Sequence, residues 1–353
     1  MQPFNYDVPA TRVVFGFGTS SKLKEEMDRL CVSRALILST PEQVEQAAKI
    51  TKHLGDSKVG LFSGAAMHTP VHVTDAAMVE VDQSRADVVV AVGGGSTTGL
   101  CKAIALRTDL PQIVIPTTYA GSEMTPILGE TKDNVKTTQR SPKVLPEVVI
   151  YDVELTLSLP LRASVTSGLN AVAHAVEALY ARDGNPIIAL MAEEGIRAFA
   201  EALPALHADA TDRSARSRAL YGAWLCGMCL GNAGMALHHK LCHTLGGTFD
   251  LPHAETHTVI LPHALAYNAP VAKEAESRIA RALGADEAAV GLYELARSLG
   301  APLSLRELGF DQSGIERAVE IAMKNPYWNP RELTAPGIRG LLQRAWNGDK
   351  PAP

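Results

Sequence analysis

The sequence predicts an α/β N-terminal domain with a Rossmann-like, mostly parallel sheet, followed by an all-helical C-terminal domain. Two observations support this fold class. Up to about residue 150, short runs of β-branched residues alternate with segments of helical spacing. After Leu159 and Pro160 those runs disappear, and alanine, leucine, glutamate and arginine dominate. We therefore place the two domains at residues 1–158 and 159–353.

The N-terminal domain is expected to hold six strands joined by helices. Candidate strands lie at residues 12–15, 35–39, 58–62, 87–92, 112–116 and 147–151, and helical segments between them include 41–54 and 73–85. Strands separated by helices form βαβ units, in which the strands run parallel. The run DVVVAV at 87–92 is apolar without alternation, which is typical of a central strand covered on both faces.

The C-terminal domain shows only helical patterns. Helical spacing covers residues 164–181, 187–206, 213–230 and 286–299. The segment 183–186 predicts a helix-to-helix turn, and the proline-rich segment 325–336 predicts a loop. No internal repeat is visible.

Composition narrows the class of protein. With 353 residues, 46% of them hydrophobic, the chain can bury a large core and is not expected to be disordered. Five cysteines without regular spacing do not form a disulfide scaffold. A net charge of -5 without a basic run makes nucleic acid an unexpected partner, and no apolar stretch is long enough to predict a membrane span. The first residues lack the pattern of a signal peptide, so we expect a cytoplasmic enzyme.

A glycine-rich junction predicts a phosphate-binding loop. Residues 93–98 read GGGSTT, directly after the central strand and before a helix. Glycines let backbone N–H groups approach a ligand, and the helix N-terminus favours an anion. Gly94, Gly95 and Ser96 are therefore candidates to hold a pyrophosphate. A second hydroxyl-rich junction, with Thr117 and Thr118, follows the next strand. The segment GFGTSS at 16–21 stands at the wrong place for such a loop and is interpreted as a turn.

Histidines form the second candidate site. Three pairs have a spacing of four residues, which places both members on one helix face: Asn170 with His174, His239 with His243, and His253 with His257. Such spacing aims two side chains at one metal or one substrate. His238 and His263 are expected to point elsewhere. The cysteines Cys226 and Cys229 lie in an apolar helical stretch and are interpreted as core residues.

A carboxylate, which a divalent metal site usually includes, is missing from these pairs. Asn170 is neutral, and Glu177 is nearly two helical turns away.

These residues resemble the iron-containing alcohol dehydrogenase superfamily over nearly the whole chain. The motifs are GGGSTTG at 93–99, PTTYAGSEMTP at 116–126, TSGLNAVAHAVEALYA at 166–181 and HKLCHTLGGTFDLPHAETH at 239–257. Metal-dependent members bind their ion through one aspartate and three histidines. The matching positions here are Asn170, His174, His239 and His253, so one ligand is replaced by a neutral amide.

Further departures resemble one branch of that family, whose members reduce maleylacetate. They are Gly99 where the family has an acid, Ala254 after His253, and His257 where asparagine is common; NPYWNPR at 325–331 is also similar to the branch. The resemblance implies reduction of the C=C bond of a dicarboxylate substrate by NADH or NADPH, without a metal, in the degradation of aromatic compounds. It also implies a homodimer.

Reduction of this C=C bond would create an enolate that needs hydrogen-bond donors, and we assign roles to individual residues on that basis. His243 and His253 would donate hydrogen bonds and a proton to the substrate, while Asn170, His174 and His239 would orient it; His257 shares the face of His253. Arg331 is a candidate for binding a substrate carboxylate.

Further residues would contact the cofactor. Thr117, Thr118, Leu157 and Lys136 would flank it. Ser39 and Thr40 stand where NAD-specific relatives carry an aspartate, so both cofactors should be accepted.

Three alternatives remain open. The first is a metal-dependent alcohol or polyol dehydrogenase of the same fold, which would carry an aspartate at the position of Asn170. A histidine-rich metal-binding protein would have no use for a phosphate loop. A serine hydrolase would need a G-x-S-x-G elbow directly before a helix, and no such elbow precedes a suitable helix here.

Overall fold

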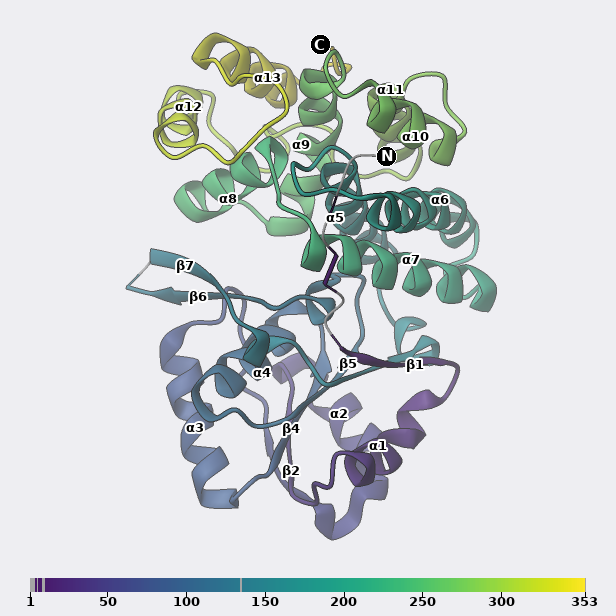
Figure 1. Ribbon diagram of the computed structural model, residues 1–353, viewed down its shortest axis with the longest axis vertical. Coiled ribbons are helices and arrows are strands. Elements are labelled where there is room, and N and C mark those ends of the chain that lie inside the picture. Colours follow the sequence, from purple (N-terminus) through teal and green to yellow (C-terminus); the bar gives the residue numbers. More distant parts are fainter. Residues whose placement is uncertain (1–3, 5, 8–9, 134, 353) are drawn as a thin grey trace. The chain divides into compact units, whose positions relative to one another are not determined.

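The computed structural model describes residues 4, 6–7, 10–133 and 135–352 (Figure 1). The chain forms two compact units. One is Asp7–Leu159, and the other is Pro160–Pro353 together with the residues before Asp7. Each unit is described by itself below.

The first unit is built on a six-stranded parallel sheet, which confirms the predicted fold class. Its strands are β1 (Arg12–Gly16), β2 (Ala35–Leu38), β3 (Lys58–Phe62), β4 (Val88–Gly93), β5 (Gln112–Pro116) and β8 (Val148–Asp152). Their order is β1-β8-β5-β4-β2-β3, and every pair is parallel. The strand ends differ from the prediction by one residue at most.

Helices cover both faces of this sheet, as its apolar central strand requires. Val88, Val90 and Val92 of β4 share a core with Leu23 and Met27 of α1 (Leu23–Arg29). Helix α2 (Val44–Ile50) packs on that same side. On the other face, Cys101 of α4 (Gly95–Thr108) contacts the Val89 carbonyl at 4.0 Å, and α3 (Val71–Ser84) runs beside α4 (Figure 1). Helix α1 was not predicted, because its short, mostly charged segment buries only one apolar face.

A second, two-stranded sheet was also not predicted. Strands β6 (Ile127–Lys132) and β7 (Val135–Arg140) pair antiparallel. Both segments are largely polar, so they lack the apolar runs by which the other strands were identified. The expected cofactor contact Lys136 lies in β7, but its side chain falls outside the described residues.

The order of the strands predicts a crevice at the carboxyl ends of β2 and β4. The chain leaves β2 toward α2 on one face, and it leaves β4, the neighbour of β2, toward α4 on the other face. Loops that diverge from adjacent parallel strands leave a crevice at their carboxyl ends, and ligands of doubly wound sheets bind there. The glycine loop and Ser39-Thr40 flank this crevice.

The second unit contains nine helices among its described residues. They are α5 (Leu161–Leu179), α6 (Pro186–Ala208), α7 (Arg213–Asn232), α8 (Leu237–Phe249), α9 (His253–Asn268), α10 (Lys273–Leu283), α11 (Ala288–Ser298), α12 (Gly314–Lys324) and α13 (Ala335–Asn347). The predicted loop at 325–336 is irregular up to Thr334, the N-cap of α13, which begins at Ala335.

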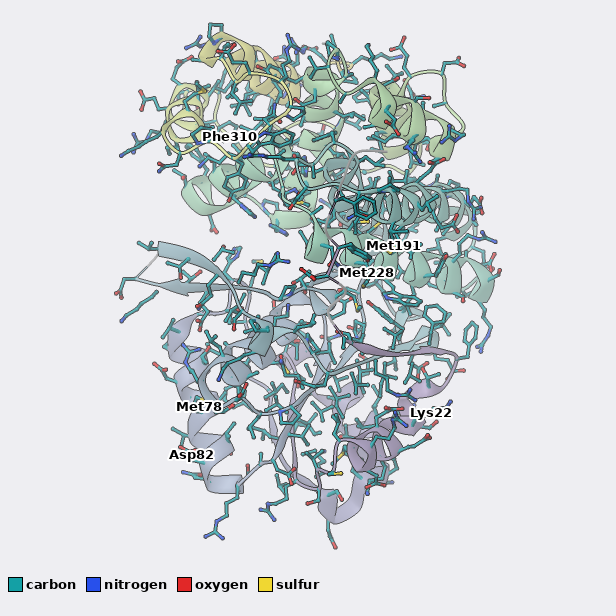
Figure 2. The ribbon with its side chains drawn as sticks, viewed as in Figure 1. Lys22, Met78, Asp82, Met191, Met228 and Phe310 are labelled. Carbon is teal, nitrogen blue, oxygen red and sulfur yellow. The ribbon has the colours of Figure 1, made fainter. Side chains whose placement is uncertain are left out.

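Helix α5 lies at the centre of this unit. It packs against α6, α7 and α9, and nearly all of its residues are buried. Small residues permit this, because a Cβ on Gly168 would lie only 3.0 Å from Phe199 of α6. A second core joins α8, α9, α12 and α13, and it includes Phe310, which is labelled in Figure 2. The Phe310 ring meets Phe249 edge to face at 4.9 Å between centroids. These contacts hold α5, α8 and α9, the three helices that carry the histidine pairs.

Within the described residues, no single helix has the length and apolar content needed to cross a membrane; α7 and α8 meet that criterion only together, as a pair bent by 96°.

Candidate active site

The glycine loop is shaped by close contacts that exclude side chains. Gly93 ends β4 with φ 156°, and a Cβ there would clash with Thr97 Oγ1. A Cβ on Gly94 would lie 2.9 Å from Thr118 Cγ2, whereas Gly95 has no heavy atom nearer than 3.8 Å. Gly94 is the N-cap of α4 and offers no side chain to its first-turn N–H groups. Those groups are therefore available to an anion.

Unpaired hydroxyls surround this loop. Ser39 Oγ after β2, Thr97 Oγ1 in α4 and Ser122 Oγ after β5 are buried and have no hydrogen-bond partner among the residues that the structure describes. Buried polar atoms are normally paired, so three unpaired hydroxyls at one sheet edge fit a polar ligand such as a dinucleotide. This observation comes from the chain itself and supports the predicted cofactor site.

The other predicted cofactor residues follow the carboxyl ends of four adjacent strands. Thr40 follows β2 and Ser96 follows β4. Thr117 and Thr118 follow β5, where Thr117 Oγ1 accepts a hydrogen bond from Gln43 at 2.8 Å. Leu157, half-buried, follows β8.

One exposed carboxylate in the loop that follows β2 was not considered in the sequence. Glu42 accepts hydrogen bonds from its own backbone N–H and from the Thr40 hydroxyl, which hold its pKa below the ordinary value. An acid therefore stands in the loop that follows β2, where Ser39 and Thr40 had indicated none.

A buried lysine supports the loop after β5. Lys102 of α4 donates to the carbonyls of Ser122 at 2.6 Å, Thr125 at 2.6 Å and Ile127 at 3.0 Å. Burial lowers the pKa of Lys102 to about 7. Three carbonyl contacts from one ammonium fasten this loop to α4. No motif identified Lys102, because its partners are backbone atoms distant in sequence.

The segment at 16–21 forms a turn whose donors are already paired. Gly18 N–H and Ser20 N–H donate to the Asp152 carboxylate at 2.8 and 2.9 Å. This occupation by Asp152 agrees with the interpretation of a structural turn.

In the helical unit, α5, α8 and α9 bring the predicted histidines together. The ring centroids of His239 lie 5.2 Å from His174, 6.0 Å from His243 and 5.0 Å from His257. His253 lies 4.4 Å from His257. Asn170 lies one turn before His174 on α5, and its Oδ1 is buried without a partner. We call these six residues the histidine cluster: Asn170, His174, His239, His243, His253 and His257.

Glu177 orients one member of the cluster. Its carboxylate accepts hydrogen bonds from the backbone N–H groups of Ala236 and His238, each at 2.7 Å. It also bonds His239 Nδ1 at 2.7 Å, and it is fully buried. A carboxylate accepts only, so His239 carries a proton on Nδ1 and its Nε2 is free to face a ligand. The spacing from Asn170 had suggested no role for Glu177.

The expectation that His238 points elsewhere is wrong. Its ring is fully buried, and its Nε2 lies 2.9 Å from Nδ1 of His257. Position 238 lies on a different face of α8 from His239, but α9 packs against that face and supplies His257. His263, by contrast, forms no ring contact with the cluster among the described residues.

Burial keeps much of the cluster neutral. Desolvation lowers the pKa of His174 and of His257 well below 6.5, and neighbouring histidines lower both further. The buried atoms Asn170 Oδ1, His174 Nδ1, His239 Nε2 and His257 Nε2 have no hydrogen-bond partner. The cluster therefore offers neutral donors and acceptors, which suits a ligand with several oxygen atoms.

Two further residues near His243 were not considered in the sequence, Tyr327 in the loop after α12 and Lys240 of α8. The Tyr327 hydroxyl lies 3.0 Å from His243 Nδ1, and Lys240 Nζ lies 5.6 Å from the Tyr327 ring centroid. Arg331 instead donates to the Tyr267 carbonyl at 2.7 Å and stacks on the Tyr267 ring. Lys240 is therefore the cation that lies over the Tyr327 ring, whereas Arg331 fastens the loop to Tyr267.

Comparisons with known proteins agree with this architecture. Residues 10–153 match the family model of iron-containing alcohol dehydrogenase, and residues 164–346 match that of the Fe-containing alcohol dehydrogenase family, C-terminal. A maleylacetate reductase of Sphingobium indicum is 58% identical over 99% of both chains. One from Burkholderia cepacia is 57% identical over 100% of both. The crystal structure of maleylacetate reductase from Agrobacterium tumefaciens superposes with a TM-score of 0.97 at 57% identity, covering 99% of this chain and 100% of that one.

Proposed function

Because the chain belongs to the iron-containing alcohol dehydrogenase family, we propose that it is an oxidoreductase that reduces the C=C bond of maleylacetate with NADH or NADPH. The product is 3-oxoadipate. The observation that carries this function is the full-length similarity to maleylacetate reductases, with which the histidine cluster agrees. The absence of a metal from the mechanism and the roles of single residues are parts of the same proposal.

The first unit would hold the cofactor. Backbone N–H groups at Gly94, Gly95 and Ser96 would bind the pyrophosphate at the start of α4. Ser39 and Thr40 lie where a ribose would be contacted, and Thr117, Thr118, Lys136 and Leu157 would flank the remainder. When bound, the reduced nicotinamide supplies a hydride to the alkene carbon β to the ketone of the substrate.

The helical unit would stabilise the charge that this addition creates. Addition to a C=C bond conjugated to a ketone produces an enolate, whose oxygen needs hydrogen-bond donors. We assign His243 and His253 as donor and acid, one of which delivers a proton to the carbon α to the ketone. Asn170, His174 and His239 orient the substrate, and Lys240 offers a positive charge to one of its carboxylates.

A metal does not fit this donor set well. The family's aspartate is replaced by Asn170, so no anionic ligand remains to offset a dication. The His174 and His239 rings are stacked, with 27° between their planes. In the described part of the chain, ligand atoms of three such side chains come within 4.8 Å of one another only at His238, Cys242 and His257, a different set.

The test is a spectrophotometric assay of NADH loss with maleylacetate, before and after prolonged dialysis against EDTA. We expect maleylacetate-dependent oxidation of NADH that survives chelation. No activity with maleylacetate would overturn the proposed substrate. Activity that is lost on chelation and restored by Fe²⁺ or Zn²⁺ would overturn the metal-free mechanism and favour a metal-dependent dehydrogenase.

We also propose a cytoplasmic homodimer. All five cysteines are free thiols, four of them buried, which suits a reducing compartment. Light scattering on the purified protein tests the dimer directly.

A further inference from the structure

We propose that His238 is a positioning residue that holds His257 as the tautomer protonated on Nε2, so that His257 donates a hydrogen bond to the substrate. The inference rests on the proposed function, because it assigns a role within the same site. It starts from the contact between His238 Nε2 and His257 Nδ1, 2.9 Å apart and fully buried.

One of these two nitrogens must carry the proton that joins the rings. Both rings are fully buried, where a charged imidazolium would be costly, so each ring is neutral and has a single N–H. Either His238 Nε2–H donates to His257 Nδ1, or His257 Nδ1–H donates to His238 Nε2. The first arrangement leaves the His257 proton on Nε2, and the second leaves the His238 proton on Nδ1.

The surroundings distinguish the two arrangements. His238 Nδ1 is buried without a partner, so a proton there would remain an unpaired buried N–H, which proteins rarely tolerate. His257 Nε2 is also buried without a partner, but it lies on the side of the ring away from His238, and the ring itself contacts His239 and His253 of the cluster. A dicarboxylate or an enolate oxygen can accept from that atom. The first arrangement is therefore the one that substrate binding favours.

The proton position on His257 complements that on His239, which is bonded to Glu177. Glu177 holds the proton of His239 on Nδ1, which leaves His239 Nε2 as an acceptor. His238 holds the proton of His257 on Nε2, which makes that atom a donor. Two imidazoles whose centroids are 5.0 Å apart thus present opposite hydrogen-bonding characters. The donor on His257 attracts a carboxylate or ketone oxygen and the acceptor on His239 repels one, so this asymmetry would favour one orientation of the dicarboxylate.

Cys242 gives the group a second possible role, as a metal site, which the geometry does not favour. Its Sγ lies 3.7 Å from His238 Nε2, and the three side chains are buried. However, the two ring nitrogens already bond each other, and burial raises the pKa of the Cys242 thiol well above 9. A neutral thiol binds a metal poorly, and the two imidazole nitrogens that bond each other are not available as ligands.

The experiment compares His238→Gln with His238→Leu. The amide nitrogen of glutamine can reach the position of Nε2 and donate to His257 Nδ1, whereas leucine fills the space without a donor. We expect kcat with maleylacetate to fall tenfold or more in His238→Leu and by less than threefold in His238→Gln, with NADH affinity unchanged. Cys226→Ala, at a buried thiol of α7 outside the cluster, is the packing control and should retain wild-type kcat.

A spectroscopic readout is independent of activity. In protein labelled with ¹⁵N at histidine side chains, His257 should show a protonated Nε2 and an unprotonated Nδ1 with 3-oxoadipate bound. His238→Leu should convert it to a mixture of tautomers. A His257 proton on Nδ1, or equal loss of kcat in folded His238→Gln and His238→Leu, would overturn the inference. If the wild-type enzyme fails to reduce maleylacetate, the function fails, while the spectrum of the free protein still reports the tautomer.

Discussion

Single side chains set the chemistry of the histidine cluster through the protons that they carry. Burial keeps His174 and His257 neutral, Glu177 fixes the proton of His239, and Tyr327 bonds His243. His243 is only half-buried, so of these residues it is well placed to exchange a proton with solvent.

This assignment predicts the effect of His243→Ala. Loss of a donor and acid at the developing enolate should lower kcat and kcat/KM together by about 10²-fold, while NADH affinity stays unchanged. Steady-state kinetics and an NADH titration measure the two quantities. His207→Ala, an exposed histidine at the end of α6, is the control and should cost nothing. An unchanged kcat in His243→Ala would remove His243 from the catalytic step.

The loop after β2 predicts cofactor choice. For the wild type, kcat/KM with NADH and with NADPH should agree within about tenfold, or roughly 1.4 kcal/mol. Thr40→Asp should lower the value for NADPH at least tenfold relative to NADH, through repulsion of the 2′-phosphate. Glu42→Gln removes the carboxylate beside Thr40 and should move the ratio toward NADPH. If neither variant changes the ratio, this loop does not reach the ribose.

At the scale of elements, the start of α8 depends on one carboxylate from α5. Helix α8 has no side-chain cap of its own, and Glu177 accepts the N–H groups of Ala236 and His238 instead. The same carboxylate orients His239, so the position of the helix and the orientation of a site residue are coupled.

This coupling predicts that Glu177 variants lose stability and activity together. Glu177→Gln should destabilise the fold by about 1–3 kcal/mol, because an amide donor then faces groups that need an acceptor. It should also lower kcat about tenfold, since His239 loses its fixed tautomer. Urea unfolding and kinetics measure both effects. Glu320→Gln, exposed on α12, should change stability by less than about 0.5 kcal/mol. A stable Glu177→Gln with full activity would contradict the coupling.

At the scale of the whole molecule, buried histidines make stability depend on pH. His174, His238, His257 and His263 all have a pKa lowered by burial. As pH falls below about 6.5, these groups take up protons in the unfolded chain but not in the folded one. The free energy of unfolding is therefore not reduced by these histidines above about pH 6.5, and it falls progressively as the pH drops below that value.

His263 allows this effect to be measured outside the cluster. Burial lowers its pKa from 6.5 to about 4, and both of its ring nitrogens lack a partner. Protonation of His263 in the unfolded chain alone then lowers the free energy of unfolding of the wild type by about 2 kcal/mol at pH 5 relative to pH 8. His263→Leu should remove that part of the acid dependence, which urea unfolding at the two pH values measures. Parallel pH profiles for the two proteins would show that His263 is not neutral in the folded state.

The sequence by itself determined the alternation of strands and helices, the glycine loop and the helix faces of the three residue pairs. These features depend on residues close in the chain, where strand and helix periods and glycine sterics act directly. The tertiary structure decided which faces meet. Glu177 and His239 are 62 positions apart, and His243 and Tyr327 are 84 apart. No local spacing encodes such contacts, because they arise only when α5, α8, α9 and the loop after α12 pack around one buried site.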